Sequence, residues 1–276
     1  MASVAPAAPP AASPEALPAG PPLWRSTLNR VVALCLAELQ KLRHDRSELY
    51  TRAIQPALWL LIFGETFTRL RAIPTGNLPY IDYLAPGILA QSTLFMAIFY
   101  GIQIIWERDV GLLTKLLVTP TPRAALIAGK AFAAGLRALS QVIVVLLLSA
   151  LLRVALTWNP LKLLGTVAAV LLGAAFFATV SMTIAGLARS RERLMGIGQA
   201  ITMPLFFASN ALYPIAVMPI WLRALSTGNP LSYEVDALRG MLLGTPSHLL
   251  LDFGVLLAAL AAGITAAATL LPRLAR

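Results

Sequence analysis

The residues of this chain whose types and spacing suit a specific chemistry are concentrated in one polar insert, Glu107–Arg123, which reads ERDVGLLTKLLVTPTPR. The insert lies between two long apolar runs. Charged groups and a short leucine-rich stretch at such a place suit noncovalent contact with a soluble partner. The alternative is a helix that lies flat on a membrane, which has the same amphipathicity.

Local signals predict a brief, stiff helix within this insert. Gly111 permits a sharp bend, and Thr119-Pro120-Thr121-Pro122 stops the helix because proline lacks the amide donor. Arg123 and Lys130 then begin the next apolar run. The apolar cluster consists of Leu112, Leu113, Leu116, Leu117 and Val118.

Motifs for covalent catalysis or for metal and nucleotide binding are absent from the sequence. Gly129-Lys130 is followed by Ala131 and lacks the upstream glycine of a phosphate-binding loop. There is no HExxH and no Ser/His/Asp set, and His44 and His248 lack metal-ligand spacing. We therefore expect no enzymatic activity, no metal and no cofactor in this chain.

The composition predicts an integral membrane protein. Hydrophobic residues make up 58% of the 276 residues, charged residues 12%, and the mean hydropathy is +0.76. A soluble domain cannot bury that much apolar surface. In a soluble protein the net charge of +10 would suggest nucleic-acid binding, but in a membrane protein the placement of the charges matters more than their sum.

Six apolar segments each approach or exceed the ~20 residues needed to cross the hydrocarbon layer as a helix. They lie near 53–70, 84–106, 130–152, 161–188, 194–213 and 249–271. With the N-terminus inside, the inner loops and tails hold 15 Lys and Arg residues and the outer loops six. The positive-inside rule then predicts that both termini are cytoplasmic.

The chain before the first segment has two parts. Residues 1–22 are rich in Ala, Pro and Ser and are expected to form a disordered cytoplasmic tail. Between Trp24 and Tyr50 apolar residues recur every three or four positions, with basic residues opposite. This pattern predicts a helix in the membrane interface; the alternative is that its apolar stripe packs on protein.

Ionisable residues inside the predicted spans are candidates for function. Glu65 and Arg69 have the spacing of a self-neutralising pair, and Asp252 is expected to reach water from the start of the last span. Arg137 either extends to the inner surface or faces a polar bundle interior. Glu65 is the one serious candidate for the buried carboxylate of an ion-coupled carrier.

Between the fifth and sixth segments, Pro214–Gly244 is too apolar for a solvated loop. Its prolines and Gly228 predict two short helices that meet at Gly228-Asn229-Pro230. Ser232 is expected to cap the second helix, with Glu234 and Asp236 in its first turn. We expect a re-entrant or lid-like element at the outer face.

Two of these stretches resemble motifs of the ABC-2-type permeases, the membrane subunits of bacterial ATP-driven exporters. The first is similar to the family's E-R-x-x-G-x-L-x-x-L-L-V-T-P loop and the second to its N-P-[LV]-[ST]-Y and [DA]-A-[LM]-R-G element. The resemblance runs from about Trp24 to Leu271. The matching residues are Glu107, Arg108, Gly111, Leu113, Leu116, Leu117, Val118, Thr119 and Pro120, then Asn229–Tyr233 and Asp236–Gly240.

The resemblance implies an all-α membrane domain over residues 23–276, with an interfacial helix, six spans, a coupling helix after span two and a re-entrant hairpin before span six. It implies two separate P-loop ATPase subunits that bind the ATP and Mg²⁺, and a second permease subunit, expected to be an identical copy. The implied location is the bacterial inner membrane. The drug-efflux and nodulation-type lipo-oligosaccharide export branch is the most similar.

In this interpretation Glu107, Arg108, Gly111, Leu113, Leu116, Leu117 and Pro120 couple the chain to the ATPase. The outer element contains Asn229, Pro230, Tyr233, Asp236, Arg239 and Gly240, in which Asp236 and Arg239 either gate the exit or form a local ion pair. Pro204 with Gly196 and Gly198 permits bending of span five. The rival hypotheses are an ion-driven secondary transporter and a non-transporting scaffold.

Overall fold

The fold is taken from a computed structural model of the 276-residue chain. It describes residues 31–33, 35–36, 40, 46–70, 73–76, 78–111, 122–188 and 190–274. The predicted tail 1–22 and most of the predicted helix Trp24–Tyr50 lie outside these residues. So do four of the predicted coupling residues, Leu113, Leu116, Leu117 and Pro120.

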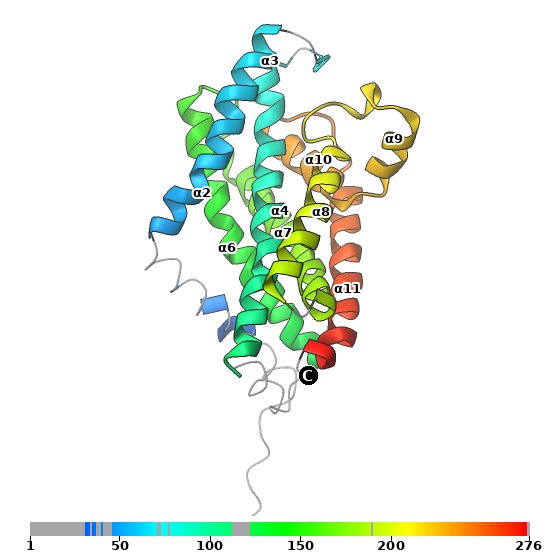
Figure 1. Ribbon diagram of the computed structural model, residues 1–276. Coiled ribbons are helices and arrows are strands. Elements are labelled where there is room, and N and C mark those ends of the chain that lie inside the picture. The colour runs from blue at the N-terminus through cyan, green and yellow to red at the C-terminus, as the bar shows by residue number, and fades with distance from the viewer. Residues whose placement is uncertain are drawn as a thin grey trace, which may run out of the picture.

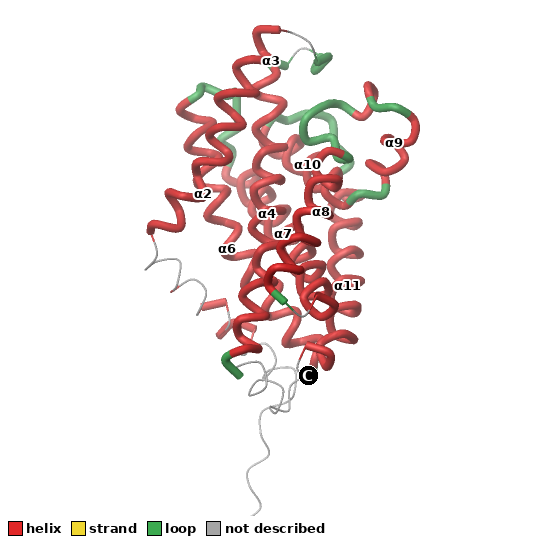
Figure 2. The backbone as a smooth tube through the Cα atoms, viewed as in Figure 1, coloured by secondary structure: helices red, strands yellow, loops and turns green. Residues whose placement is uncertain are grey.

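The described residues form a helical bundle without strands (Figures 1 and 2). The helices run up and down the long axis, and the loops gather mainly at one end. In chain order the elements are α2 (Arg46–Leu58), the π turn η1 (Trp59–Gly64), α3 (Glu65–Leu70), α4 (Tyr80–Asp109), α6 (Arg123–Leu151), α7 (Pro160–Ala188), α8 (Arg191–Phe207), the 3-10 turn η2 (Ile215–Val217), α9 (Ile220–Thr227), α10 (Pro230–Leu242) and α11 (Leu249–Leu274).

Four of the helices, α4, α6, α7 and α11, are long and apolar enough to cross a membrane. They overlap the predicted spans at 84–106, 130–152, 161–188 and 249–271. α4 and α6 begin earlier than predicted, directly after Pro79 and Pro122. A proline suits the start of a helix because its fixed φ is compatible with the helix and its missing N–H is not needed there.

The other two predicted spans are helical but less regular. Residues 46–70 run as α2, η1 and α3, with Pro56 in α2 shortly before the π turn. α8 ends at Phe207, six residues before the predicted end at Tyr213, and at 17 residues it is about 25 Å long. The chain from 208 to 212 is therefore non-helical backbone inside the bundle.

Small residues let α4 and α7 pack closely at the centre of the bundle. Gly101 of α4 donates its backbone N–H to the hydroxyl of Ser181 in α7 at 3.1 Å, and a methyl group on Gly101 would meet that oxygen. Ala174, Ala178 and Ala185 of α7 are also fully buried. Close packing of small residues is the usual source of helix association in lipid.

Large apolar side chains on the outside of the bundle face outward, as lipid contact requires. Leu147 of α6, Leu164 and Leu187 of α7 and Leu250 of α11 are each more than half exposed. In the most apolar 18-residue stretch of each helix, only 17% is buried in α11, whereas 72% is buried in α4. α4 is therefore the most buried of the four long helices.

A close backbone approach at Gly87 generates the first prediction. A methyl group at Gly87 would lie 2.2 Å from the carbonyl oxygen of Ala211. We expect Gly87→Ala to cost about 1–3 kcal/mol or more, because neither backbone can move freely. Denaturant-dependent unfolding in detergent measures this loss. Gly254→Ala, at a glycine with open space, is the control, and equal stability of the two variants would contradict the geometry.

Candidate functional site

Two networks of polar side chains lie at opposite ends of the bundle. The α4/α6 end is where α4 finishes at Asp109, α6 begins at Arg123 and α7 is followed by α8; the C-terminal end of α11 lies there too (Figure 1). The α10 end is the opposite one, where α8 finishes and α10 begins. The described start of the first predicted motif, Glu107–Gly111, lies at the opposite end of the bundle from the second motif.

A buried ion pair fixes the base of the polar insert at the α4/α6 end. The ammonium of Lys130 in α6 donates to the carboxylate of Glu107 in α4, with side chains only 4% and 9% exposed. The Gln103 amide nitrogen lies 3.4 Å from the same carboxylate, and the Arg137 guanidinium donates to the Gln103 oxygen at 3.3 Å. This polar chain joins α4 to α6 over several turns.

The second link at this end joins α4 to α8 and is exposed. Asp109 accepts from Arg108 at 2.8 Å and from Arg191, the first residue of α8, at 3.2 Å. Ser190 caps α8 by accepting from the backbone N–H of Arg193. Asp109 therefore neutralises a cation at a helix N-terminus, where positive charge is unfavourable.

Gly111, just after α4, has a φ of +73°, and a methyl group there would meet nothing within 4 Å. A non-glycine residue is disfavoured at Gly111 by backbone conformation, not by crowding. Of the predicted coupling residues, Glu107 faces into the bundle and Arg108 is only partly exposed.

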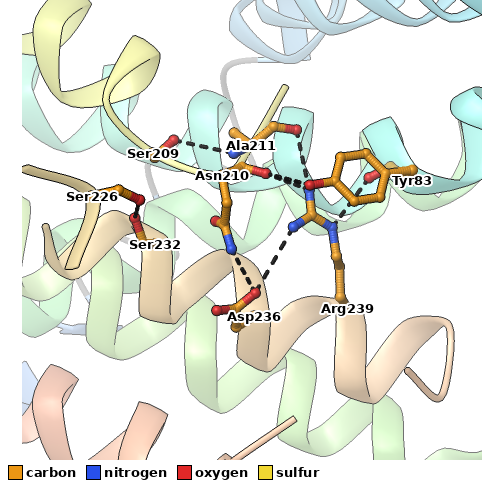
Figure 3. Close-up of polar contacts among 8 residues, drawn as sticks. All are labelled: Tyr83, Ser209, Asn210, Ala211, Ser226, Ser232, Asp236 and Arg239. Carbon is orange, nitrogen blue, oxygen red and sulfur yellow. Dashed lines mark hydrogen bonds and ion pairs between the residues drawn. The ribbon is translucent and has the colours of Figure 1, made fainter. Parts of the chain in front are cut away.

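At the α10 end, Arg239 holds the non-helical segment after α8. Its guanidinium donates to the carbonyls of Asn210 at 2.6 Å and Ala211 at 3.2 Å, and to that of Tyr83 at 3.4 Å. Its central carbon lies 3.6 Å from the centroid of the Tyr83 ring (Figure 3). A planar fork of donors suits such an array of carbonyls, and its stacking on the ring adds attraction.

Other side chains, from α4 and from the start of α10, hold the same region. Tyr80 and Tyr83 of α4 donate their hydroxyls to the carbonyls of Leu212 and Asn210 at 3.1 and 3.0 Å. Asn229 donates to the carbonyl of Leu205 at 2.7 Å, near the end of α8. The end of α8 and the segment after it are thus held by side chains of α4 and α10 and by the N-cap of α10.

The Asp236 carboxylate joins this network by accepting from the Asn210 amide at 2.6 Å, and it lies 3.9 Å from Arg239 (Figure 3). Burial raises the pKa of Asp236, while Arg239 and the Asn210 hydrogen bond lower it. The ion pair expected from the spacing is present but long, and Arg239 makes its shorter contacts with carbonyls. Tyr233 instead faces outward and donates to the Thr227 carbonyl.

The predicted N-cap of α10, Ser232, was wrong by three residues. Asn229 is the N-cap, accepting from the backbone N–H of Leu231, and Pro230 is the first helical residue. Ser232 lies inside the helix and bonds to the hydroxyl of Ser226 instead (Figure 3). Glu234 and Asp236 therefore lie beyond the first turn, which contains no acidic residue. Asn followed by Pro is a stronger start signal than a later serine.

The buried carboxyl groups are also different from those predicted. Glu65 is 54% exposed and forms a 4.0 Å pair with Arg69, whereas Glu234 is fully buried. One Glu234 oxygen lies 3.0 Å from the Thr93 hydroxyl, and the other lies where a methyl group on Gly173 would be. Glu234 lies at helical spacing within an apolar stripe of α10. This spacing in the sequence could have indicated its burial. The stripe consists of Leu231, Val235, Leu238 and Leu242.

Two further ionisable residues are now placed. Asp252 is 3% exposed, so the expectation that it reaches water was wrong. Arg137 extends toward Gln103 of α4, which corresponds to the polar-interior alternative. No cluster of three or more metal-ligating side chains occurs in the part of the chain that the structure describes.

Comparison with known proteins assigns the family. The sequence profile of the family described as ABC-2 type transporter matches residues 29–243, most of the chain. The chain is a member of this family. As an ABC-2 permease it is a multi-pass membrane protein, and it lacks an ATPase domain and a cofactor of its own.

Individual relatives align with different shares of the chain. A putative transport permease ycf38 of Cyanophora paradoxa is 30% identical over 195 residues, 69% of this chain and 66% of the relative. The daunorubicin resistance permease DrrB1 of Streptomyces coeruleorubidus is 27% identical over 237 residues, 85% and 81%. Nodulation protein J of Rhizobium leguminosarum bv. trifolii is 28% identical over 174 residues, 62% and 65%. The chain spans just under two thirds of the length of the ycf38 permeases of Cyanophora paradoxa and Porphyra purpurea.

The buried pair at the α4/α6 end predicts a non-additive stability effect. Lys130→Met leaves the Glu107 carboxylate buried without its cation, and we expect a loss of about 3–5 kcal/mol. Adding Glu107→Gln removes the unpaired charge and should restore most of that loss, as a double-mutant cycle in detergent measures. Arg191→Met, in the exposed pair with Asp109, is the control. An equal effect of Lys130→Met and Arg191→Met would contradict the burial.

The geometry of Arg239 predicts that lysine cannot replace it. A single ammonium cannot reach the carbonyls of Tyr83, Asn210 and Ala211 together, so Arg239→Lys should cost about 2–3 kcal/mol. Thermal unfolding in detergent measures this. Arg223→Lys is the matched control, since Arg223 is exposed and makes one bond, to the Ala216 carbonyl. If both variants melt together, the proposed network does not hold the segment.

Proposed function

We propose that this chain is the permease subunit of an ATP-driven exporter that moves an amphipathic substrate across the bacterial inner membrane. Two separate P-loop ATPase subunits would bind ATP and Mg²⁺ and supply the energy. Membership of the ABC-2 type transporter family supports this function. So does the absence of a phosphate-binding loop from the sequence, which leaves ATP hydrolysis to partner subunits.

The structural observation that carries the proposal is the firmly held base of the loop after α4. Glu107 is paired with Lys130 inside the bundle, Asp109 is paired with Arg191, and Gly111 follows α4 with a positive φ. We infer that the next residues, with Leu113, Leu116, Leu117 and Pro120, seat in a groove of the ATPase. Glu107 would then hold the loop from within, while Arg108 lies nearer the partner.

The proposed topology has six crossings with both termini in the cytoplasm. The four long spans are joined by α2–η1–α3 as the first crossing and α8 as the fifth. Residues 1–22 would be a cytoplasmic tail and residues 23–276 the transmembrane domain, beginning with an interfacial helix. The α4/α6 end would be cytoplasmic, which places Lys130, Arg191 and Arg193 on the positively charged side.

At the outer face, α9 and α10 would form a re-entrant hairpin. Arg239 and Asn229 donate to backbone carbonyls at the broken end of α8, and Asp236 accepts from the side-chain amide of Asn210. Re-entrant structure requires such partners for its backbone carbonyls. These contacts favour a lock that holds the hairpin on α4 and α8. Opening of an exit route would require this lock to shift.

The substrate and the second subunit are inferred from the family and the relatives. One relative is named for daunorubicin resistance and another for nodulation, so an amphipathic drug, lipid or lipo-oligosaccharide is proposed. The pathway would lie between two permease subunits, and a second copy of this chain is the proposed partner.

An ion-driven secondary transporter remains the second candidate because of Glu234. A fully buried carboxyl group inside a membrane bundle is the kind of group that proton-coupled carriers use. Flux that requires ATP favours the exporter, whereas flux that follows an ion gradient without ATP favours the carrier.

The test of the proposed function is purification of the tagged chain from its native host under gentle solubilisation. We expect a P-loop ATPase to co-purify in equal amount. Gly111→Pro should weaken or abolish this, because proline cannot adopt a φ of +73° and removes the N–H that bonds to the Arg108 carbonyl.

Gly76→Pro is the matched control for that experiment. Gly76 also has a positive φ of +69° and open space around it, but lies in the loop between α3 and α4. It should leave the ATPase bound. Absence of an ATPase from the intact protein in several detergents would contradict the exporter. Equal loss in both variants would contradict the location of the contact.

A further inference from the structure

A cavity of about 360 Å³ lies between α2, α4 and α6, away from both ends of the bundle. Its size falls within the roughly 300–1,000 Å³ of small-molecule sites. Phe95 and Gln141, which line it, lie near the middle of α4 and α6. The cavity is therefore at the depth where polar side chains of membrane proteins are most often functional.

One wall of the cavity is aromatic. Phe95 and Phe99, one turn apart on α4, have ring centroids 6.4 Å apart and planes 26° from parallel. Both rings are only partly buried, although their neighbours on α4 are mostly fully buried. Two such faces suit a flat aromatic ligand, which stacks favourably on phenyl rings.

A polar residue of α6, Gln141, also lines the cavity. Gln141 is 2% exposed, and its carbonyl oxygen accepts no hydrogen bond from the described part of the chain. An unpaired acceptor in an apolar layer is unfavourable, and native structures usually satisfy it. The neighbouring Ser92 hydroxyl is already engaged, donating to the Ile88 carbonyl at 2.7 Å. The Gln141 oxygen thus suits the O–H or N–H of a ligand.

The third wall, from α2, is also atypical. Pro56 lines the cavity and has no N–H to donate to the carbonyl one turn before it. Three residues after Pro56, at Trp59, α2 passes into the π turn η1. Single π turns inside helices are frequent at functional sites.

All eight described lining residues are uncharged, so a charged ligand would lack a partner there. We propose that this cavity binds a neutral, flat aromatic molecule that directs a hydroxyl or amide donor at Gln141. In the proposed exporter this names the substrate class, and that part of the inference rests on the proposed function. Binding itself does not depend on it.

The experiment uses the purified full chain in lipid nanodiscs, without any ATPase, and two probes of one shape. 1-Hydroxypyrene carries a hydroxyl donor and pyrene does not. Saturable binding above that of empty nanodiscs is measured by fluorescence. We expect 1-hydroxypyrene to bind about fivefold more tightly than pyrene, the effect of one net hydrogen bond.

Two variants locate the hydrogen bond. Gln141→Met keeps the length of the side chain but removes the acceptor. It should lower the affinity for 1-hydroxypyrene to that for pyrene. Saturable pyrene binding that persists in this variant shows that it is folded. Gln91→Met is the matched control: Gln91 is also buried with an unpartnered amide nitrogen, but it does not line the cavity. It should preserve the fivefold difference.

The proposal is overturned if neither probe binds saturably, as expected when lipid chains fill the cavity, or if both bind equally to the intact chain. A fivefold preference that survives Gln141→Met, or is lost in Gln91→Met, also overturns it. Since no ATPase is present, these outcomes are separate from those of the proposed function. A chain that binds 1-hydroxypyrene but recruits no ATPase would fail as an exporter and still hold this site.

Discussion

The rest of the structure depends on one constraint, that backbone groups inside a bilayer need partners within the protein. α8 ends at Phe207, and the chain up to Leu212 is not helical, so its carbonyls require donors from elsewhere. Arg239, Tyr80 and Tyr83 supply them. This requirement places α10 against α4 and α8, and Gly87 allows the close approach of the backbone at Ala211.

α4 links the two polar ends of the bundle. Near its start, Tyr83 contacts Arg239; at its finish, Glu107 and Asp109 are held by α6 and α8. In the proposed mechanism, closure of the ATPase subunits displaces the loop after α4. Because Glu107 and Lys130 form a buried pair, α4 and α6 would move together. α4 would then transmit the displacement to the Arg239 network and the hairpin.

Apolar length and proline placement were sufficient to predict the four long spans and the two short helices around Asn229, because both signals are local. The partners of the ionisable residues could not be predicted in this way. Burial of Glu234 and Asp252 depends on which helix face meets α4 and α7, and the Glu107–Lys130 pair joins residues 23 positions apart. The end of span five was missed since α8 stops where side chains from α4 and α10 replace its backbone hydrogen bonds.

The most direct test of the central claim is ATP-dependent transport in proteoliposomes that contain the purified chain and its co-purified ATPase. A fluorescent short-chain lipid serves as the amphipathic probe, and its movement is followed with a protonophore present. The account predicts movement that starts on addition of ATP, persists without a proton gradient and stops in Gly111→Pro. Movement that occurs without ATP and collapses with the protonophore would contradict it and favour an ion-coupled carrier.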